Sequence, residues 1–268
     1  MHRVSVGILA CNNEAIIADC LQSVIWADDL FIILDTRSTD RTADVARAFG
    51  ARVVPHRFEN FAAQREFGLS RARGDWLFYI DSDERATRHV EKEVRRVIQD
   101  DSFDGWWVPR RNVIWGQKVR HGGWYPDYQL RLLRIGRAHY DLHRQVHEVV
   151  ELEGKAGYLE NPLIHYNYRT FAEFRRKQRQ YVPYEARIRY KEGKRPKPWT
   201  YLSQPLREFW RRYVTLKGYR DGMLGLILCS LIAYYYGLLV TVHLERLWRE
   251  KQRDTDAGQQ TWPDTPEE

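Results

Sequence analysis

The chain has 268 residues, 43% of them hydrophobic, which suits one substantial core with an appendage better than two equal domains. Its three cysteines, Cys11, Cys20 and Cys229, are too few and too scattered for a disulfide framework or a thiolate metal site, so a reducing compartment is expected. The net charge of +7 is concentrated, because residues 169–220 contain 16 Lys or Arg against 4 Asp or Glu. Such a basic segment fits nucleic acid, an anionic membrane or an acidic substrate.

The first apolar run, residues 4–10, is too short for a signal peptide and is not followed by a small-residue cleavage pattern. We therefore expect the N-terminus to stay in the cytosol.

Short apolar runs alternate with amphipathic stretches through the first hundred residues. Strands are predicted at residues 4–10, 30–34, 52–54 and 76–80, and helices at residues 14–26, 39–49, 61–73 and 88–98. This alternation predicts an α/β fold, a Rossmann-like and mostly parallel sheet with helices on both faces. Ligands of such folds bind beyond the carboxyl ends of the strands, so the residues that follow each apolar run are the candidate site.

Polar residues follow three of these predicted strands, at residues 11–14, 35–40 and 81–84. Asp81 and Asp83 stand one residue apart at a strand end, where both can approach one hard cation, Mg²⁺ or Mn²⁺, while phosphate oxygens supply other ligands. A solvated turn with helix-capping acids would explain an isolated Asp-x-Asp. The strand context and the other two polar segments favour the metal site here.

Residues 8–14, 35–42 and 74–84 resemble, in order and spacing, the family 2 glycosyltransferases, which have the GT-A fold. The resemblance extends over roughly residues 3–245 and is strongest to the bacterial lipopolysaccharide-core type. The later segments that fit this type are Arg131-Leu132, Val146-His147-Glu148, His165-Tyr166 and residues 217–222.

The resemblance implies an inverting, metal-dependent enzyme. It would move a sugar from a nucleoside diphosphate sugar, with a UDP-sugar favoured, to a lipid-linked or lipopolysaccharide-core acceptor. A polyprenyl-phosphate glycosyltransferase would share the same motifs and differ only in its acceptor. The alternative from a different functional class is a basic nucleic-acid-binding protein. The carboxylates that would face phosphates at the strand ends argue against this alternative.

The same resemblance implies that Asp35 accepts hydrogen bonds from the base or ribose of the donor, with residues 12–14 at the border of the nucleotide pocket. A strand-end carboxylate also suits that contact on physical grounds. The alternative role for Asp35 is to cap the following helix, which Ser38 and Asp40 can do equally well.

Gln64 and Arg65 match a Gln-Lys-Asn element of the family, and Arg65 could balance the diphosphate charge. Glu66 replaces the Asn of that element, and Arg37 stands where many relatives have Gly. The candidate donor-binding residues are Ala10, Asn12, Glu14, Asp35, Arg37, Gln64, Arg65, Asp81 and Ser82. The candidate metal ligands are Asp81, Asp83 and, by resemblance, His147.

Inverting transfer needs one general base that takes the proton of the acceptor hydroxyl. Asp127 lies in a segment that resembles the acidic acceptor-side motif of the family and is the first candidate, with Glu148 the second. An ion pair with Arg131 at helical spacing is the alternative role for Asp127. Arg131 and His165 are also candidates for contact with the diphosphate or the acceptor, and by the same resemblance His165 could instead complete the metal shell.

Residues 222–242 contain no charged side chain and are long enough to cross a bilayer at about 1.5 Å of rise per residue. The basic segment before them would be attracted to anionic lipids, which favours a membrane over nucleic acid and the cytoplasmic face of the inner membrane. Peripheral or monotopic association, a single span and a helix packed on its own domain all stay open. The expected division is a catalytic domain at 1–168, a helical membrane-associating region at 169–253 and a disordered acidic tail at 254–268.

Overall fold

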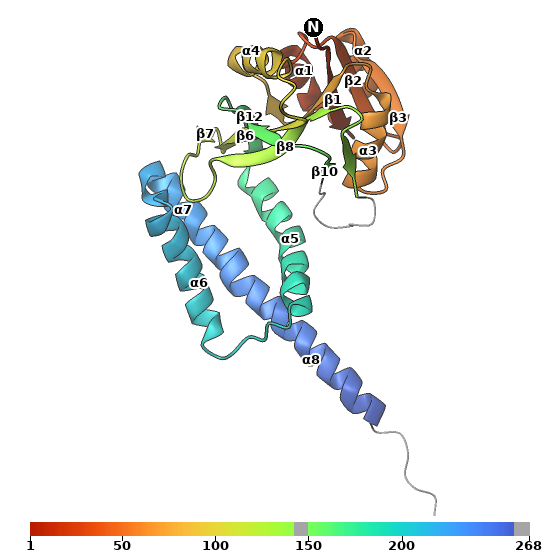
Figure 1. Ribbon diagram of the computed structural model, residues 1–268. Helices are drawn as coiled ribbons and strands as arrows, with labels where there is room; N and C mark the ends of the chain where they lie inside the picture. Colours follow the sequence, from red (N-terminus) through yellow and green to blue (C-terminus); the bar gives the residue numbers. More distant parts are fainter. Residues whose placement is uncertain (142–149, 260–268) are drawn as a thin grey trace, which may run out of the picture. The chain divides into compact units, whose positions relative to one another are not determined.

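The structure is a computed structural model that describes residues 1–141 and 150–259 (Figure 1). Contacts divide the chain into two compact units. The first, a sheet unit, comprises Met1–Lys118 and Tyr125–Asn167. The second, a helical unit, comprises Val119–Trp124 and Tyr168–Glu268, so it takes in a short loop from the middle of the sheet region.

The predicted strands and helices of the first hundred residues are confirmed. The strands are β1 (Val4–Ala10), β2 (Asp29–Asp35), β3 (Arg52–His56) and β4 (Trp76–Asp81). The helices are α1 (Glu14–Ser23), α2 (Thr42–Ala48), α3 (Phe61–Arg71) and α4 (Arg88–Val97). Helix α2 begins at Thr42, later than predicted, because the Asp40 carboxylate accepts the backbone N–H groups of Thr42 (3.0 Å) and Glu14 (2.8 Å) and holds residues 38–41 in a turn.

The strands lie in the order β3-β2-β1-β4, all parallel, as the α/β prediction requires. Beyond β4 the sheet continues with β8 and β6, which pair in antiparallel fashion, whereas β11 pairs with β6 in parallel. These later elements are β5 (Glu84–Arg85), β6 (Gly105–Ile114), β7 (Gln117–Lys118), β8 (Asp127–Arg134), β11 (Ala156–Tyr158) and β12 (Leu163–Tyr168), with β9 (Ala138–Tyr140) and β10 (Val150–Leu152) as a separate pair. The ten-stranded sheet is therefore mixed.

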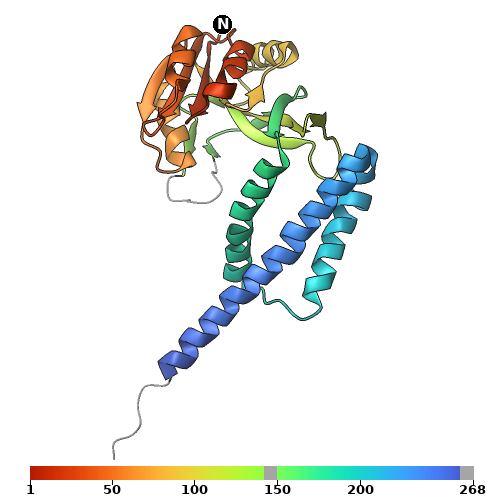
Figure 2. The same ribbon diagram turned by 180° about the vertical axis from the view of Figure 1, so that it is seen from behind.

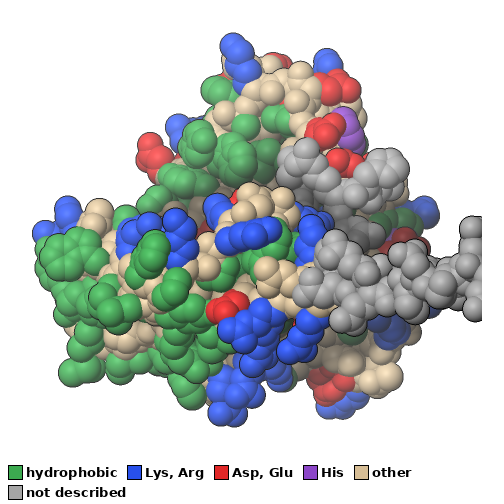
Figure 3. Space-filling model, turned by 90° about the horizontal axis from the view of Figure 1, so that it is seen from below, with side chains coloured by type: hydrophobic (Ala, Val, Ile, Leu, Met, Phe, Trp, Pro, Cys, Tyr) green, Lys and Arg blue, Asp and Glu red, His purple; other side chains and the backbone are tan. Residues whose placement is uncertain are grey.

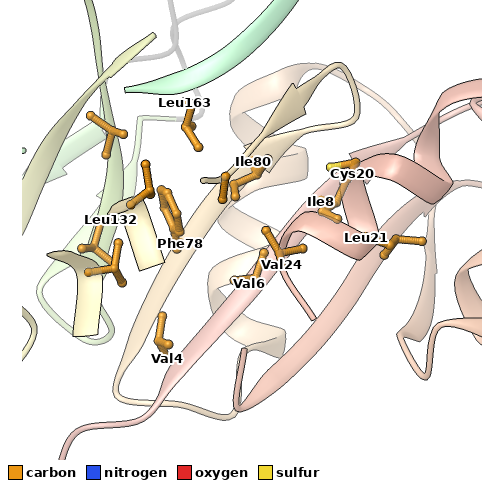
Figure 4. Close-up of a cluster of buried hydrophobic side chains, with 14 of the residues drawn as sticks. Val4, Val6, Ile8, Cys20, Leu21, Val24, Phe78, Ile80, Leu132 and Leu163 are labelled. Carbon is orange, nitrogen blue, oxygen red and sulfur yellow. The ribbon is translucent and has the colours of Figure 1, made fainter. Parts of the chain in front are cut away.

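Alternate residues of the parallel strands fill a hydrophobic core on each face of the sheet. Val6 and Ile8 of β1 pack with Leu21 of α1 on one face, together with residues of α4 (Figure 4). On the other face, Leu77 and Tyr79 of β4 pack in a second cluster that includes residues of α3. Helices thus cover both faces of the sheet. Because this packing holds the strands in place, the polar segments that follow the strands have fixed positions.

The helical unit contains α5 (Phe171–Lys191), α6 (Thr200–Trp210), η1 (Arg211–Thr215), η2 (Gly218–Asp221), α7 (Gly222–Ile232), η3 (Ala233–Leu239) and α8 (Val240–Gln259). A continuous helix at Gly218–Arg253 is long and apolar enough to cross a membrane by length and composition, and half of its apolar window is buried within the protein. Within the unit, α5 packs on α8 and α6 packs on η3. Figures 1 and 2 show these helices from opposite sides.

The loop Val119–Trp124 is tied to η2 by one carboxylate. Asp221 accepts the backbone N–H groups of Arg120 (3.1 Å) and His121 (2.8 Å) and pairs with Nδ1 of His121 at 2.9 Å. The turn before η2 needs Lys217 at a φ of +57°. Asp221 belongs to the 217–222 segment that fits the lipopolysaccharide-core type, so that segment has a structural role in this chain.

Replacing Gly237 with alanine is expected to destabilise the helical unit. A Cβ at this position would lie 2.5 Å from Cα of Pro205 on α6, a backbone contact that cannot move alone. Overpacking of this kind costs about 1–3 kcal/mol, whereas alanine in an unhindered helix would gain about 1 kcal/mol over glycine. Urea unfolding of the full chain measures the sign of the change. Ser230→Ala, on the exposed side of α7, is the matched control, and a Gly237→Ala protein more stable than wild type would contradict the close packing.

Candidate active site

The carboxyl ends of β1, β2 and β4 are adjacent in the sheet, so the three polar segments meet at one edge. Asn12 joins the first segment to the second: its N–H donates to Oγ of Ser38 (3.0 Å) and its Oδ1 accepts the N–H of Thr39 (2.8 Å). Glu14 pairs with Arg41 at 2.7 Å. Hydrogen bonds from the Arg41 backbone and side chain lower the pKa of Glu14. Asn12 and Glu14 therefore shape this edge through contacts within the protein.

Asp35 is buried, with 3% of its surface exposed, and its carboxylate accepts Nε (3.0 Å) and Nη2 (2.6 Å) of Arg37. The Arg37 hydrogen bonds lower the pKa of Asp35 to about 2, so it stays ionised at neutral pH. The Arg37 side chain is 63% exposed and can also face an anionic ligand. At the start of α2 it is Asp40, and not Asp35, that accepts the backbone N–H of Thr42. The Asp35 carboxylate instead accepts the backbone N–H groups of Arg37 (3.1 Å) and Phe58 (3.4 Å) in addition to the Arg37 side chain.

Gln64 and Arg65 lie side by side on α3 and have different partners. Gln64 is buried, and its Oε1 lies 2.8 Å from Nδ1 of His56 on β3. Arg65 is buried as well, lies over the Tyr79 ring and reaches Oδ1 of Asp81 at 3.2 Å. Of this predicted pair, Arg65 is therefore the one joined to the carboxylate motif.

The first carboxylate of the Asp-x-Asp motif is held by arginines from two elements. Nη1 of Arg131, on β8, donates to Oδ1 of Asp81 at 3.2 Å, and its Nη2 donates to Oδ2, while Arg65 approaches from α3. Burial opposes ionisation of Asp81, but the charges of Arg131 and Arg65 outweigh it and hold its pKa below the usual range. Arg131 thus lies at the motif, as its candidate role near the diphosphate requires.

Arg110 joins Asp127 to this cluster and was not predicted from the sequence. It lies on β6 and contacts Oδ2 of Asp127 (2.6 Å), Oε1 of Glu84 (3.2 Å) and Oδ2 of Asp81 (4.0 Å). Glu84 is fully buried and accepts the backbone N–H of Asp81 at 2.9 Å. The sequence signal for Arg110 was a charged pair, Arg110-Arg111, inside a long apolar strand, where charges are rare unless they are paired.

Asp127 begins β8, so the helical ion pair with Arg131 does not form. Its Oδ2 accepts Nε (3.0 Å) and Nη2 (2.6 Å) of Arg110, and its Oδ1 accepts Nε2 of Gln129 at 3.0 Å. The side chain is 29% exposed. Asp127 is therefore oriented by a charged partner and still reachable from solvent. Its rival Glu148 lies outside the described residues, as does His147.

The second carboxylate of the motif lies beside a histidine. Nε2 of His165, on β12, is 3.6 Å from Oδ2 of Asp83. The other ring nitrogen, Nδ1, is 2.8 Å from Oδ1 of Asn112, which also accepts Nδ2 of Asn167 at 3.1 Å. The contact with Asn112 fixes the orientation of the His165 ring, with Nε2 on the side of Asp83. From the family resemblance, His165 was a candidate to contact the diphosphate or the acceptor, or to complete the metal shell.

Asp83 and His165 fit a divalent cation as a carboxylate and an imidazole whose ring is held in place by a second contact. No cluster of three or more His, Cys, Asp or Glu side chains suited to a metal occurs in residues 1–141 and 150–259. Remaining ligands would be phosphate oxygens and water, as is usual for cations that bridge nucleotides.

Asp81, also predicted as a metal ligand, has its carboxylate bonded to arginines. Ser82 contributes its backbone oxygen to Arg85, and Ala10 lies buried at the end of β1.

The parallel β3-β2-β1-β4 sheet, its antiparallel extension and the acidic motif after β4 define a glycosyltransferase of the GT-A class. The profile of the family described as Glycosyl transferase family 2 matches residues 5–177, and the chain belongs to this family. The resemblance stated from the sequence motifs is thereby confirmed.

Relatives support the same assignment. The chain is 29% identical over 235 residues to the lipopolysaccharide core biosynthesis glycosyltransferase LpsC of Rhizobium meliloti, covering 84% of this chain and 85% of the relative. It is 31% identical over 104 residues to an uncharacterized glycosyltransferase of Rickettsia typhi, covering 39% of this chain and 36% of the relative.

Solved structures that match parts of this chain include glucosyl-3-phosphoglycerate synthase of Mycobacterium tuberculosis and TarS of S. aureus. The first is 23% identical with a TM-score of 0.35, over 42% of this chain and 44% of the other. The second is 14% identical with a TM-score of 0.47, over 67% and 39%. The chain thus spans less than half the length of either solved structure.

Proposed function

We propose that this glycosyltransferase uses a nucleoside diphosphate sugar, with a UDP-sugar favoured, and a divalent cation, Mg²⁺ or Mn²⁺. The observation that carries the proposal is the Asp83–His165 pair, in which Nε2 of His165 lies 3.6 Å from Oδ2 of Asp83 and the ring is held by Asn112. Asp83 and His165 would hold the cation, and a cation bound there supplies positive charge to the leaving diphosphate. Arg131 and Arg65, already beside the motif, would add charge on the same side.

The donor nucleotide would lie along the edge formed by β1 and β2. Asp35, ionised and buried, would accept hydrogen bonds from the base or ribose, and the exposed Arg37 would contact an anionic part of the donor. Asn12 and Glu14 border this region through the loop contacts that they make. The roles of Ala10, Gln64 and Ser82 would be to shape the site, by backbone or buried contacts.

Asp127 is the proposed general base. Its carboxylate would take the proton of the acceptor hydroxyl while that oxygen bonds to the anomeric carbon, and the bond from that carbon to the donor diphosphate breaks with inversion. Arg110 orients the carboxylate, and Glu84 keeps Arg110 in place from the buried side. Glu148 is the second candidate for this role.

We further propose a lipid-linked or lipopolysaccharide-core acceptor at the cytoplasmic face of the inner membrane. The relative from Rhizobium meliloti is named for lipopolysaccharide core biosynthesis and aligns over 84% of this chain. The apolar helix and the basic segment beside it suit a membrane-held substrate. A polyprenyl-phosphate acceptor would use the same site and is separated from this one by acceptor assays alone.

Thermal unfolding with a panel of nucleotide sugars tests the proposal. A ligand that binds only the native protein at 100 times its Kd raises the free energy of unfolding by about 2.7 kcal/mol. We expect one nucleotide sugar, a UDP-sugar, to raise the Tm when Mn²⁺ is present and to lose most of that effect in EDTA. The matching nucleoside monophosphate, which lacks the diphosphate, is the control. A panel without any Tm shift, with or without metal, would contradict the proposed donor site.

A further inference from the structure

Four large apolar side chains form a row along the outer side of α6. They are Trp199, Leu202, Leu206 and Trp210, spaced by three, four and four residues, and each is between 59% and 69% exposed. That spacing puts them on one side of a helix. A soluble surface rarely leaves such a row uncovered, so the row marks an interaction surface.

A second apolar row follows on the apolar helix itself. Met223, Ile227 and Tyr234 are 71%, 41% and 47% exposed, whereas Leu228 and Ile232 of the same helix are buried. Helix α6 packs against η3, so the two rows belong to one helix pair. Figure 3 shows hydrophobic side chains gathered over the left of the view, where Figure 1 places α6 and α7. The seven residues of the two rows are called the apolar face below.

The rim of the apolar face is basic. Its exposed cations are Lys194, Arg195, Lys197, Arg207, Arg211, Lys217 and Arg220. Glu208 is the one acidic residue in 194–220, and it is paired with Arg211 and Arg212. Two copies of this face would bring like charges together, which disfavours a homodimer through it. Anionic lipid supplies both the apolar interior and the negative head groups that this surface lacks.

Crossing the bilayer is incompatible with the packing of the helical unit. Two parts of the apolar helix pack against neighbouring helices: its α8 part packs against α5, and its η3 part packs against α6. The outer side of α5 carries the exposed Arg175, Arg176, Arg179 and Arg187. A span would carry these charged side chains toward the hydrocarbon, where an arginine is costly to bury. The helix has the length of a span, but its neighbours hold it at the surface.

We infer that the apolar face lies in the plane of one leaflet of an anionic bilayer, and that the helix Gly218–Arg253 does not cross it. This deepens the proposed function, since it names the surface through which the enzyme would reach a membrane-held acceptor. The apolar side chains insert to the depth of the acyl boundary, and the surrounding Lys and Arg side chains contact lipid phosphates.

Flotation of the full-length protein with vesicles tests the face. Wild type is expected to bind vesicles of phosphatidylcholine with phosphatidylglycerol at least about tenfold more tightly than phosphatidylcholine alone, because several Lys and Arg side chains lie at the rim. The Leu202→Ser/Met223→Ser variant is expected to lose at least about tenfold in binding to the anionic vesicles. Ile25→Ser, an exposed apolar residue of the sheet unit, is the matched control and should bind as wild type does.

Thermal unfolding must show that both variants fold. Wild type that does not bind anionic vesicles, or a face variant that binds as well as wild type, would overturn the inference. So would a wild-type dimer that the face variant converts to monomer, because a second copy would then cover the face. Donor hydrolysis measured in the same samples keeps the two proposals apart: if it is absent while vesicle binding is intact, the catalytic proposal fails and the docking face stands.

Accessibility of the helix ends tests orientation. In a Cys11→Ser background, Glu192→Cys and Gln252→Cys place one exposed thiol before α6 and one near the end of α8. In intact spheroplasts a membrane-impermeant maleimide is expected to label neither, and after lysis both. Labelling of Gln252→Cys in intact spheroplasts would show that the helix crosses, and would overturn the in-plane orientation.

Discussion

Asp83→Asn is expected to lower the transfer rate by at least about a thousandfold, since removal of one group that stabilises the charge of a transition state costs about 10²–10³ and this residue would also hold the cation. The fold should survive, because Asp83 is part-exposed and its close side-chain partner is His165 at 3.6 Å. Two measurements check this: the initial rate with the nucleotide sugar that stabilises the wild type, and Mn²⁺ binding by calorimetry in its presence. Both should be lost in the variant.

Asp44→Asn is the matched control for this prediction. Asp44 is an exposed carboxylate of the same unit, paired with Arg47 at 2.9 Å, and its loss should leave rate and Mn²⁺ binding unchanged. Chelation of the wild type should reproduce the effect of Asp83→Asn. A variant with near-normal rate, or a wild type indifferent to EDTA, would rule out Asp83 as a metal ligand.

Asp127→Asn is expected to lower the transfer rate by about 10²–10⁴, the range contributed by general acid–base catalysis, while donor binding is retained. The amide has nearly the shape of the carboxylate and cannot take the proton. Arg110 keeps Glu84 as an anionic partner at 3.2 Å, so the substitution does not leave a buried guanidinium without a counter-charge. The check is a split between two readouts: an unchanged Tm shift with donor and Mn²⁺, and a lost transfer rate.

Asp101→Asn, which removes an exposed carboxylate paired with Arg134, is the control for unspecific charge effects. Glu148→Gln decides between the two candidate bases. If Asp127→Asn turns over normally and Glu148→Gln shows the loss, the base is Glu148 and Asp127 serves to position Arg110.

Local signals in the sequence were sufficient for the parallel half of the fold. Strand β1 has the predicted bounds, and α1, α3 and α4 begin at the predicted residues, because short apolar runs and helical spacing report burial directly. The polar segments after β1, β2 and β4 identified the edge that carries the site, since parallel strands all end on the same side. The family followed from the same segments.

Contacts between distant strands were decided by the tertiary structure. Strands β8 and β6 continue the sheet beyond β4, and this brings Arg131 and Arg110 to an acidic motif far away in the sequence. Strand β12 likewise carries His165 to Asp83. The sequence around an arginine or histidine in a strand does not indicate which residue it will contact, because the order and register of antiparallel strands depend on the whole sheet.

In the helical unit, too, some features followed from the sequence and others only from the packing. Composition by itself determined that residues 222–242 are apolar, long enough to cross a membrane and preceded by a basic segment. The tertiary structure decided which side of that helix is covered, because α5 and α6 bury one part and leave Met223, Ile227 and Tyr234 exposed. Hydropathy sums over all sides of a helix, whereas docking depends on which side faces outward, and only packing determines that.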